Sequence, residues 1–192
     1  MPRALAVLIV SGIALGQALF APVFSAYGRA AAADSAVMIM YHRFGEGKYP
    51  STNITLAQIE DHIGELTSGR YTVLPMRKIV EDLAAGRALP ERAVGISIDD
   101  GFVSVFAEAW PRFKKAGLPF TLFTATDYHH QPIRGYMSWE QLRELARDPL
   151  VDFGHHSASH PHMADASAET ARAEIERATR VWEEKIGRRP VL

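Results

Sequence analysis

The chain has 192 residues, of which 47% are hydrophobic and 22% charged, and its formal net charge at pH 7 is −1. This is the composition of an ordinary globular protein, and the length suits one domain with a sizeable core. The near-neutral charge balance argues against a basic nucleic-acid-binding surface, so no nucleic-acid partner is expected. Because the chain contains no cysteine, disulfide bonds and cysteine-bound zinc are excluded.

Residues 1–33 differ from the rest of the chain. Arg3 gives a short basic start, an apolar stretch covers 4–24, and small residues fill 30–33, a pattern typical of a cleaved secretory signal peptide. The alternative is an uncleaved membrane anchor, since the apolar stretch is nearly long enough to cross a bilayer. We therefore expect an exported protein, periplasmic or extracellular, with residues 34–192 as its domain and no stable membrane insertion after cleavage.

Beyond this segment, apolar runs of strand length alternate with segments of helical periodicity. The run 36–40 predicts a buried strand, and after a polar loop Thr55 and Gln58 form a capping box that opens a helix ending at Gly69. A second strand is predicted at 71–74. The short helix that follows has an apolar face of three residues, Ile79, Val80 and Leu83.

The second half of the chain continues the alternation. Three further strands are predicted, at 94–98, 120–124 and 151–154. A helix at 102–115 separates the first two, and a second capping box, Ser138 with Gln141, opens the helix before the third. A long helix then begins at Ser167. Its apolar stripe has four residues, Ala171, Ile175, Ala178 and Trp182.

Repeated strand-then-helix units with short apolar strands indicate an α/β fold, with a parallel sheet and helices packed outside it. Residues 188–192 resemble the approach to another strand, so we expect the domain to be incomplete at its C-terminal end. Ligands of parallel α/β proteins bind at the carboxyl ends of the strands. Polar residues that directly follow the strands 94–98 and 151–154 are therefore candidates for chemistry.

Two adjacent carboxylates, Asp99 and Asp100, follow the strand 94–98 in the segment S-I-D-D-G. Unpaired acids are strongly disfavoured in a core, so a pair at a strand end indicates a ligand site. The structural alternative is that one Asp caps the next helix while the other is solvated, because Asp and Gly are favoured at caps and turns.

The second candidate is the loop G-H-H-S-A-S-H-P-H-M, residues 154–163. Imidazole is the commonest side-chain metal ligand, and His156 and His160 are spaced so that both rings can share one ion. The alternative is a polar surface loop that merely contains histidine. One carboxylate plus two imidazoles form a facial set suited to Zn²⁺ or a similar divalent ion, and the second carboxylate is then free to take a proton from water.

These two segments resemble the T-F-D-D-G and H-[ST]-x-S-H-P-x-[LM] motifs of the NodB-homology polysaccharide deacetylases, carbohydrate esterase family 4. The segments M-Y-H-R-F, G-L-P-F-T-L-F and M-S-W-E-Q-L agree with this family, so the resemblance spans about residues 37–190. It implies a distorted (β/α) barrel of parallel strands and Asp99 as the catalytic base. It also implies a divalent metal, Zn²⁺ before Co²⁺ or Ni²⁺, held by three ligands, Asp100, His156 and His160.

The chain departs from the family pattern at two places. Ser97 and Ile98 replace the usual Thr and Phe, which is conservative in size. The family also places motifs further downstream: an R-x-P-[YF] strand, an Asp-containing strand, and a Leu-x-x-His segment whose His is the general acid. The run R-R-P at 188–190 only approaches the first of these, so no residue is assigned as the catalytic acid.

The remaining histidines have ordinary structural interpretations as well as functional ones. His42 either reaches the cleft or packs as a structural residue. His129 and His130 are expected at the surface or on the substrate side of a loop, and not as ligands. His155 and His162 flank the matched pair, and His155 is an alternative ligand. Two tryptophans on helical stripes are expected in the core, Trp139 and Trp182.

The resemblance implies a hydrolase that removes N-acetyl groups, in preference to O-acetyl groups, from a poly- or oligosaccharide containing N-acetylglucosamine. That acetylated saccharide is the expected partner, and the sequence predicts no oligomeric state. Two alternatives remain open: an inactive, truncated deacetylase remnant that acts at most as a carbohydrate-binding protein, and another metal-dependent hydrolase such as a phosphoesterase.

Overall fold

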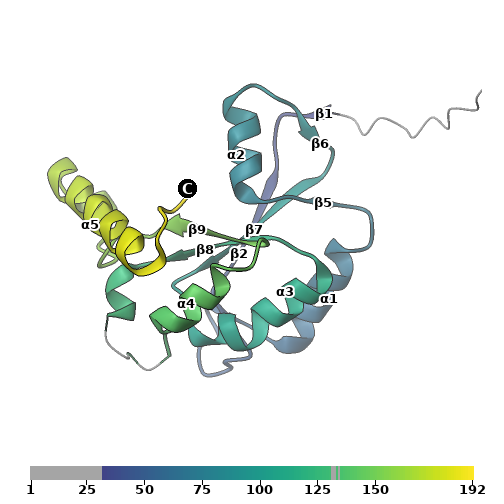
Figure 1. The fold of residues 1–192 in the computed structure, drawn as a ribbon. Coiled ribbons are helices and arrows are strands. Elements are labelled where there is room, and N and C mark those ends of the chain that lie inside the picture. The colour runs from purple at the N-terminus through teal and green to yellow at the C-terminus, as the bar shows by residue number, and fades with distance from the viewer. Residues whose placement is uncertain (1–31, 131–132, 134) are drawn as a thin grey trace, which may run out of the picture.

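The computed structural model describes residues 32–130, 133 and 135–192 (Figure 1). The predicted signal segment 1–33 therefore lies almost entirely outside the described residues. Only its last two residues are described, as β1 (Ala32–Ala33), which pairs antiparallel with β6 (Leu89–Pro90). Within the described ranges, no helix combines the length and the apolarity needed to cross a bilayer.

Parallel strands form the central sheet. Their order is β2 (Val37–Tyr41), β7 (Ala93–Asp99), β8 (Phe120–Thr124) and β9 (Val151–His155), and the short β5 (Thr72–Val73) also pairs with β7. Every pairing in this sheet is parallel, which confirms the predicted α/β class. Within the described chain β2 and β9 do not pair with each other, so the sheet is an open arc of the expected distorted, incomplete barrel. A small separate pair joins β3 (Arg43–Phe44) to β4 (Asn53–Ile54).

The helices begin largely where the sequence signals predict. They are α1 (Leu56–Leu66), α2 (Met76–Ala84), α3 (Trp110–Ala116), α4 (Trp139–Leu145) and α5 (Ala168–Ile186). Both predicted capping boxes form, with Thr55 and Ser138 as the N-cap residues of α1 and α4. The hydroxyl of Ser167 accepts a hydrogen bond from the third backbone N–H of α5, so each of these three helices has a capped N-terminus.

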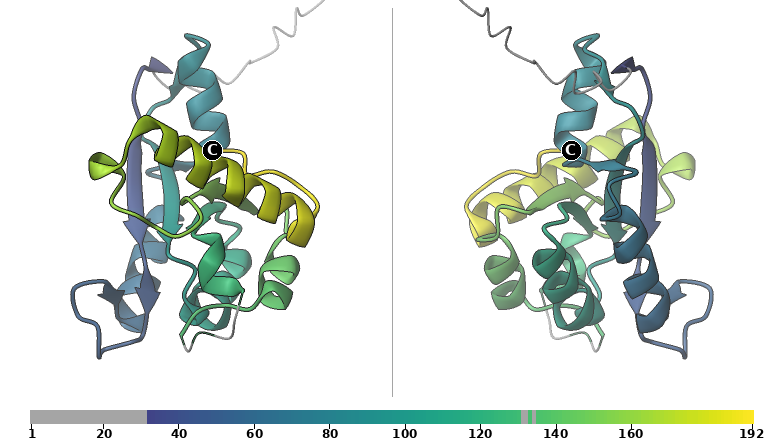
Figure 2. Two further views of the ribbon diagram at one scale, coloured as in Figure 1. Left: turned by 90° about the vertical axis from the view of Figure 1, so that its left-hand side faces the viewer. Right: turned by 90° about the vertical axis from the view of Figure 1, so that its right-hand side faces the viewer.

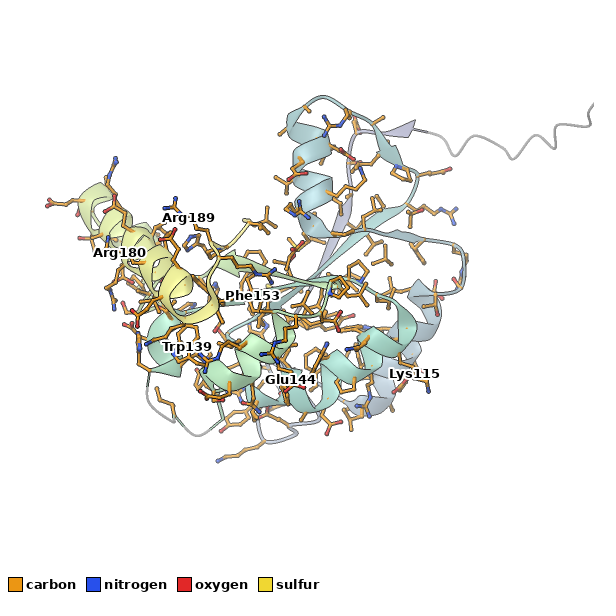
Figure 3. All side chains as sticks on the ribbon, viewed as in Figure 1. Lys115, Trp139, Glu144, Phe153, Arg180 and Arg189 are labelled. Carbon is orange, nitrogen blue, oxygen red and sulfur yellow. The ribbon has the colours of Figure 1, made fainter. Side chains whose placement is uncertain are left out.

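Helices α1, α3 and α4 cover one face of the sheet (Figure 1). Alternate residues of β7 point into this layer and are at most 3% exposed: Val94, Ile96 and Ile98. Helix α5 runs along the β9 end of the molecule (Figure 2). Its Trp182, 1% exposed, packs against Phe153 and Trp139, both labelled in Figure 3, with ring centroids 4.8 and 5.7 Å away. The prediction that Trp139 and Trp182 belong to the core is confirmed.

The predicted apolar face of α2 is only partly correct. Ile79 is fully buried, but Val80 and Leu83 are 43% and 36% exposed. The helix instead turns Asp82 toward the protein, and this residue is 7% exposed. Its carboxylate is held by two basic side chains, Lys78 at 2.6 Å and Arg87 at 2.9 Å. These ion pairs, made within α2 and its C-terminal turn, compensate the charge of the shielded carboxylate, and an apolar periodicity does not reveal them.

The predicted helix 102–115 forms without a break over residues 103–116, but it contains a π-helical turn. A π-helical turn, η1 (Val105–Ala109), precedes α3, while Phe102 lies outside the helix in an isolated antiparallel bridge with Tyr136. Pro111 explains the π-helical turn, because it has no N–H to donate to the preceding turn and its ring displaces that turn. The predicted stripe of α5 is also shorter than expected, since Ile175 is 37% exposed.

Candidate metal centre

The two candidate segments follow strands that lie on either side of β8. The register pairs Asp99 with Phe123 of β8, and Thr124, the last residue of β8, with His155 of β9. The three strands therefore end at the same edge of the sheet, and the segments after β7 and β9 face each other across β8. At this edge Asp100, His156 and His160 each offer one ligand atom, and these atoms lie within 4.8 Å of one another.

This three-residue cluster is compact and open on one side. His156 Nε2 lies 3.4 Å from Asp100 Oδ1, and the rings of His156 and His160 have centroids 4.5 Å apart. Asp100 and His156 are partly buried while His160 is exposed. One carboxylate and two imidazoles with an accessible face fit a divalent ion of the Zn²⁺ type that keeps positions for water and substrate.

The backbone at this cluster adopts conformations that most residues avoid. The described chain has four non-glycine residues with positive φ, and three of them lie here: Asp100 (69°), Ser157 (61°) and His160 (56°). Such residues cost about 1–3 kcal/mol each and concentrate at ligand sites, where the surrounding structure must hold them. Ser157 Oγ accepts a hydrogen bond from His160 N at 3.0 Å, which closes the histidine loop on itself.

Thr124 and Gly101 fix the turn that carries Asp100. Thr124 Oγ1 lies 2.9 Å from the carbonyl oxygen of Asp100 and donates to it. Gly101 has φ 74°, and a Cβ atom on it would lie 2.4 Å from Thr124 Oγ1. The last residue of β8 therefore approaches the turn so closely that only glycine fits after Asp100.

His129 supports the same turn from behind, which corrects the prediction of a surface or substrate-side histidine. It ends η2 (Thr126–His129) and is 5% exposed. Its Nδ1 lies 2.7 Å from the carbonyl oxygen of Met137, so Nδ1 donates, and Nε2 accepts from Thr124 Oγ1 at 2.6 Å. The threonine hydrogen is thus shared between Nε2 and the Asp100 carbonyl. These partners lie five and eight residues away in irregular segments, so no helical or strand periodicity indicated the burial.

Burial explains the charge state of His129. Removal from water lowers the pKa of the ring from 6.5 to about 4, against the opposing effect of its hydrogen bond to Met137. The ring is therefore neutral at pH 7 and carries its hydrogen on Nδ1. A neutral His129 can accept from Thr124, as the geometry around Asp100 requires.

The two adjacent carboxyl groups have different electrostatic environments. Burial raises the pKa of Asp99, against the opposing influence of the neighbouring His156 and His42 side chains. The pKa of Asp100 is lowered, first by its contact with the His156 side chain, which outweighs burial. Asp100 is thus the more easily ionised of the pair. His42, placed by β2 at this edge of the sheet, contributes to the field of both carboxyl groups.

The other histidines lie apart from the cluster. His155 Nε2 is 3.2 Å from Thr179 Oγ1 of α5, and burial lowers the pKa of its ring. His162 has a side chain 82% exposed and pairs with Asp165 at 2.7 Å. His130 is exposed, as predicted. The structure does not bring His155 into the three-residue cluster.

Comparison with known proteins places the chain in a family. Residues 86–192, more than half of the chain, match the family model of the polysaccharide deacetylases. The chain is 23% identical over 129 residues to the poly-beta-1,6-N-acetyl-D-glucosamine N-deacetylase of Escherichia coli K12, covering 60% of this chain and 19% of that protein. It is also 23% identical over 142 residues to YxkH of Bacillus subtilis, covering 72% of this chain and 48% of YxkH. The chain thus spans about half of the length of YxkH and about a fifth of the length of the E. coli relative.

Solved structures share the fold. The Streptococcus pyogenes deacetylase PplD, determined in complex with acetate, superposes with a TM-score of 0.72 at 15% identity, covering 81% of this chain and 70% of that one. IcaB from Ammonifex degensii gives a TM-score of 0.69 at 24% identity, covering 83% of this chain and 72% of that one. On the match of its own residues 86–192, the chain belongs to the polysaccharide deacetylase family.

Proposed function

We propose that this chain is a metal-dependent hydrolase that removes N-acetyl groups from a poly- or oligosaccharide containing N-acetylglucosamine. The observation that carries the proposal is the convergence of Asp100, His156 and His160 at one strand edge, with Asp99 adjacent in the chain. Family membership supports the reaction class. The E. coli relative, named as an N-deacetylase of poly-N-acetylglucosamine, supports the substrate class.

In this proposal Asp100, His156 and His160 hold a divalent ion, with Zn²⁺ the first choice for one carboxylate and two imidazoles. When bound, the ion supplies Lewis-acid chemistry, polarising the acetyl carbonyl and lowering the pKa of water. Asp100, the more easily ionised of the two carboxyl groups, supplies an anionic oxygen to the ion. The exposed side of His160 leaves room for a saccharide to approach the site.

Asp99 acts as the general base in the proposed reaction. Its carboxylate accepts the proton that water loses as the water oxygen bonds to the acetyl carbon. As the amide C–N bond breaks, the leaving nitrogen takes up a proton, so that acetate and a free amine on the sugar are formed; no residue of this chain is assigned as the donor of that proton. A position directly before the ligand Asp100 suits this role, because the base must stand beside the water without occupying a ligand position.

An acetate-release assay tests the proposal. We expect acetate from β-linked N-acetylglucosamine oligomers, loss of this activity after treatment with a chelator, and recovery on addition of Zn²⁺. An aryl phosphate, assayed in parallel, should not be hydrolysed. Hydrolysis of the phosphate without acetate release would favour the alternative of a metal-dependent phosphoesterase, and inactivity toward both with saccharide binding retained would favour a non-catalytic remnant.

We also propose that residues 1–33 direct export of the protein to the periplasm or the extracellular space. The basic start, apolar centre and small-residue end of this segment support the proposal. N-terminal sequencing of the protein from fractionated cells tests it. The expected result is a chain beginning at Asp34 outside the cytoplasm, and an intact N-terminus in the cytoplasmic fraction would contradict it.

A further inference from the structure

The loop between His156 and His160 is held by a side chain from a distant helix. Glu174 of α5 accepts three hydrogen bonds at Oε2, from Ala158 N at 3.1 Å, Ser159 N at 2.8 Å and Ser159 Oγ at 3.0 Å. The left-handed Ser157 turns these two successive N–H groups to the same side, where they form a small anion-binding nest. The Glu174 carboxylate occupies this nest, and its side chain is 13% exposed.

Arg177, one turn further along α5, fixes the position of the Glu174 carboxylate by hydrogen bonding. Its Nη2 donates to Glu174 Oε1 at 2.8 Å, and its Nη1 donates to both carboxylate oxygens of Asp127 at 2.7 and 2.9 Å. Asp127 N in turn donates to the carbonyl oxygen of Ala158 at 2.9 Å. The contacts form a closed circuit from the histidine loop through Glu174, Arg177 and Asp127 and back to the loop. This circuit joins α5 and η2 to the segment that carries both imidazoles.

The charge of Glu174 strengthens the circuit. Burial disfavours the anion, but hydrogen bonds from Arg177 and Ser159 outweigh it and lower the pKa of Glu174 to about 2. The side chain is therefore a carboxylate at neutral pH. Hydrogen bonds to an ionised acceptor are roughly twice as strong as neutral ones. They offset the cost of the left-handed backbone at Ser157 and His160.

We infer that Glu174 is a positioning residue for the metal ligands His156 and His160, acting through the backbone of Ala158 and Ser159. The inference rests on the proposed metal site. Glu174 fixes the turn between the two ligands, so the imidazoles are held in their converging arrangement before an ion arrives. Loss of such supporting contacts lowers metal affinity about 10–100-fold in other metal sites.

The test compares Glu174→Gln with Glu176→Gln in the full chain. Glu176 lies on the same helix and is exposed, so Glu176→Gln is a control that makes the same carboxylate-to-amide change without affecting the loop. Zn²⁺ affinity is measured by competition with a chelating dye, and hydrogen exchange at Ala158 and Ser159 is measured without metal. We expect about 10-fold or greater loss of Zn²⁺ affinity in Glu174→Gln. Faster exchange at both amides should accompany it, while Glu176→Gln matches the wild type.

Wild-type Zn²⁺ affinity in a folded Glu174→Gln variant, even one with a lowered melting temperature, would overturn the inference. A wild-type chain that binds no Zn²⁺ would instead overturn the proposed metal site, and this assignment with it. If circular dichroism shows Glu174→Gln to be unfolded, Zn²⁺ affinity is measured on Arg177→Gln instead. This variant keeps the Glu174 carboxylate and removes its counter-ion. A smaller but measurable loss of Zn²⁺ affinity is expected there, and an unchanged affinity would overturn the inference.

Discussion

Substitution of Gly101 by alanine probes how closely Thr124 approaches the turn that carries Asp100. The new Cβ would lie 2.4 Å from Thr124 Oγ1, 2.9 Å from Thr124 Cβ and 3.1 Å from His129 Cε1. Thr124 is fully buried and His129 is 5% exposed, so neither neighbour is free to withdraw. The variant must therefore displace the turn or the end of β8.

Two effects contribute to the expected loss of free energy of unfolding in Gly101→Ala. Alanine at φ 74° carries a left-handed backbone cost of about 1–2 kcal/mol. Overpacking against a buried neighbour adds about 1–3 kcal/mol. Gly117 is the matched control, because its φ is 68° and a Cβ there meets nothing within 4 Å. We expect Gly101→Ala to lower the free energy of unfolding by about 2–5 kcal/mol and Gly117→Ala by about 1–2 kcal/mol.

Urea unfolding followed by tryptophan fluorescence measures both variants, with unchanged m-values as the check that the comparison is valid. Zn²⁺ affinity, measured on the folded variants, should fall in Gly101→Ala and stay at the wild-type value in Gly117→Ala. Equal destabilisation by the two substitutions would refute the reasoning, because the close approach of Thr124 would then contribute nothing.

Three further predictions concern the core, the pH dependence and the metal. Trp182→Ala removes a side chain 1% exposed and should lower the free energy of unfolding by about 3–5 kcal/mol in urea. The pKa of His129 is about 4 in the folded chain against an ordinary 6.5, so below pH 6.5 the unfolded chain takes up a proton that the folded chain does not. Its contribution to stability should therefore be full above pH 6.5 and fall by up to about 1.4 kcal/mol per pH unit down to about pH 4, and His129→Gln should flatten that part of the profile. Zn²⁺ at 100 times its Kd should stabilise the chain by about 2.7 kcal/mol in thermal melts, and His156→Ala should abolish the gain.

Local sequence signals were sufficient for most of the secondary structure. The capping boxes at Thr55 and Ser138 form because the interacting groups are three residues apart. The strands β7, β8 and β9 follow from apolar runs that are buried in the sheet. Because parallel strands align their carboxyl ends, the meeting of the Asp99–Asp100 segment with His156 and His160 could also be predicted from the segments, while the choice of Asp100 as the ligand came from the family resemblance.

Polar contacts that an apolar pattern does not reveal account for what the sequence did not predict. Asp82 on α2 is shielded from solvent and neutralised by Lys78 and Arg87, four and five residues away. His129 is buried because Thr124 and Met137 meet both ring nitrogens, and no periodicity encodes that arrangement.

Glu174 escaped prediction for a related reason. The periodicity of α5 indicates only its apolar stripe, whereas Glu174 acts through backbone amides about 15 residues earlier in the chain. The one local signal is the spacing of Glu174 and Arg177, three residues apart, a common surface pairing on helices. Only the folded loop shows that this pair is tied to the candidate ligands.

The most direct test of the proposed site separates ion binding from proton transfer. Bound Zn²⁺ and acetate release from N-acetylglucosamine oligomers are measured on the same preparations of wild type, Asp99→Asn and Asp100→Asn. The proposed roles predict that Asp99→Asn keeps near wild-type Zn²⁺ while acetate release falls by about 10²–10⁴-fold, and that Asp100→Asn loses the metal. Undiminished acetate release by Asp99→Asn, or full Zn²⁺ occupancy in Asp100→Asn, would contradict those roles.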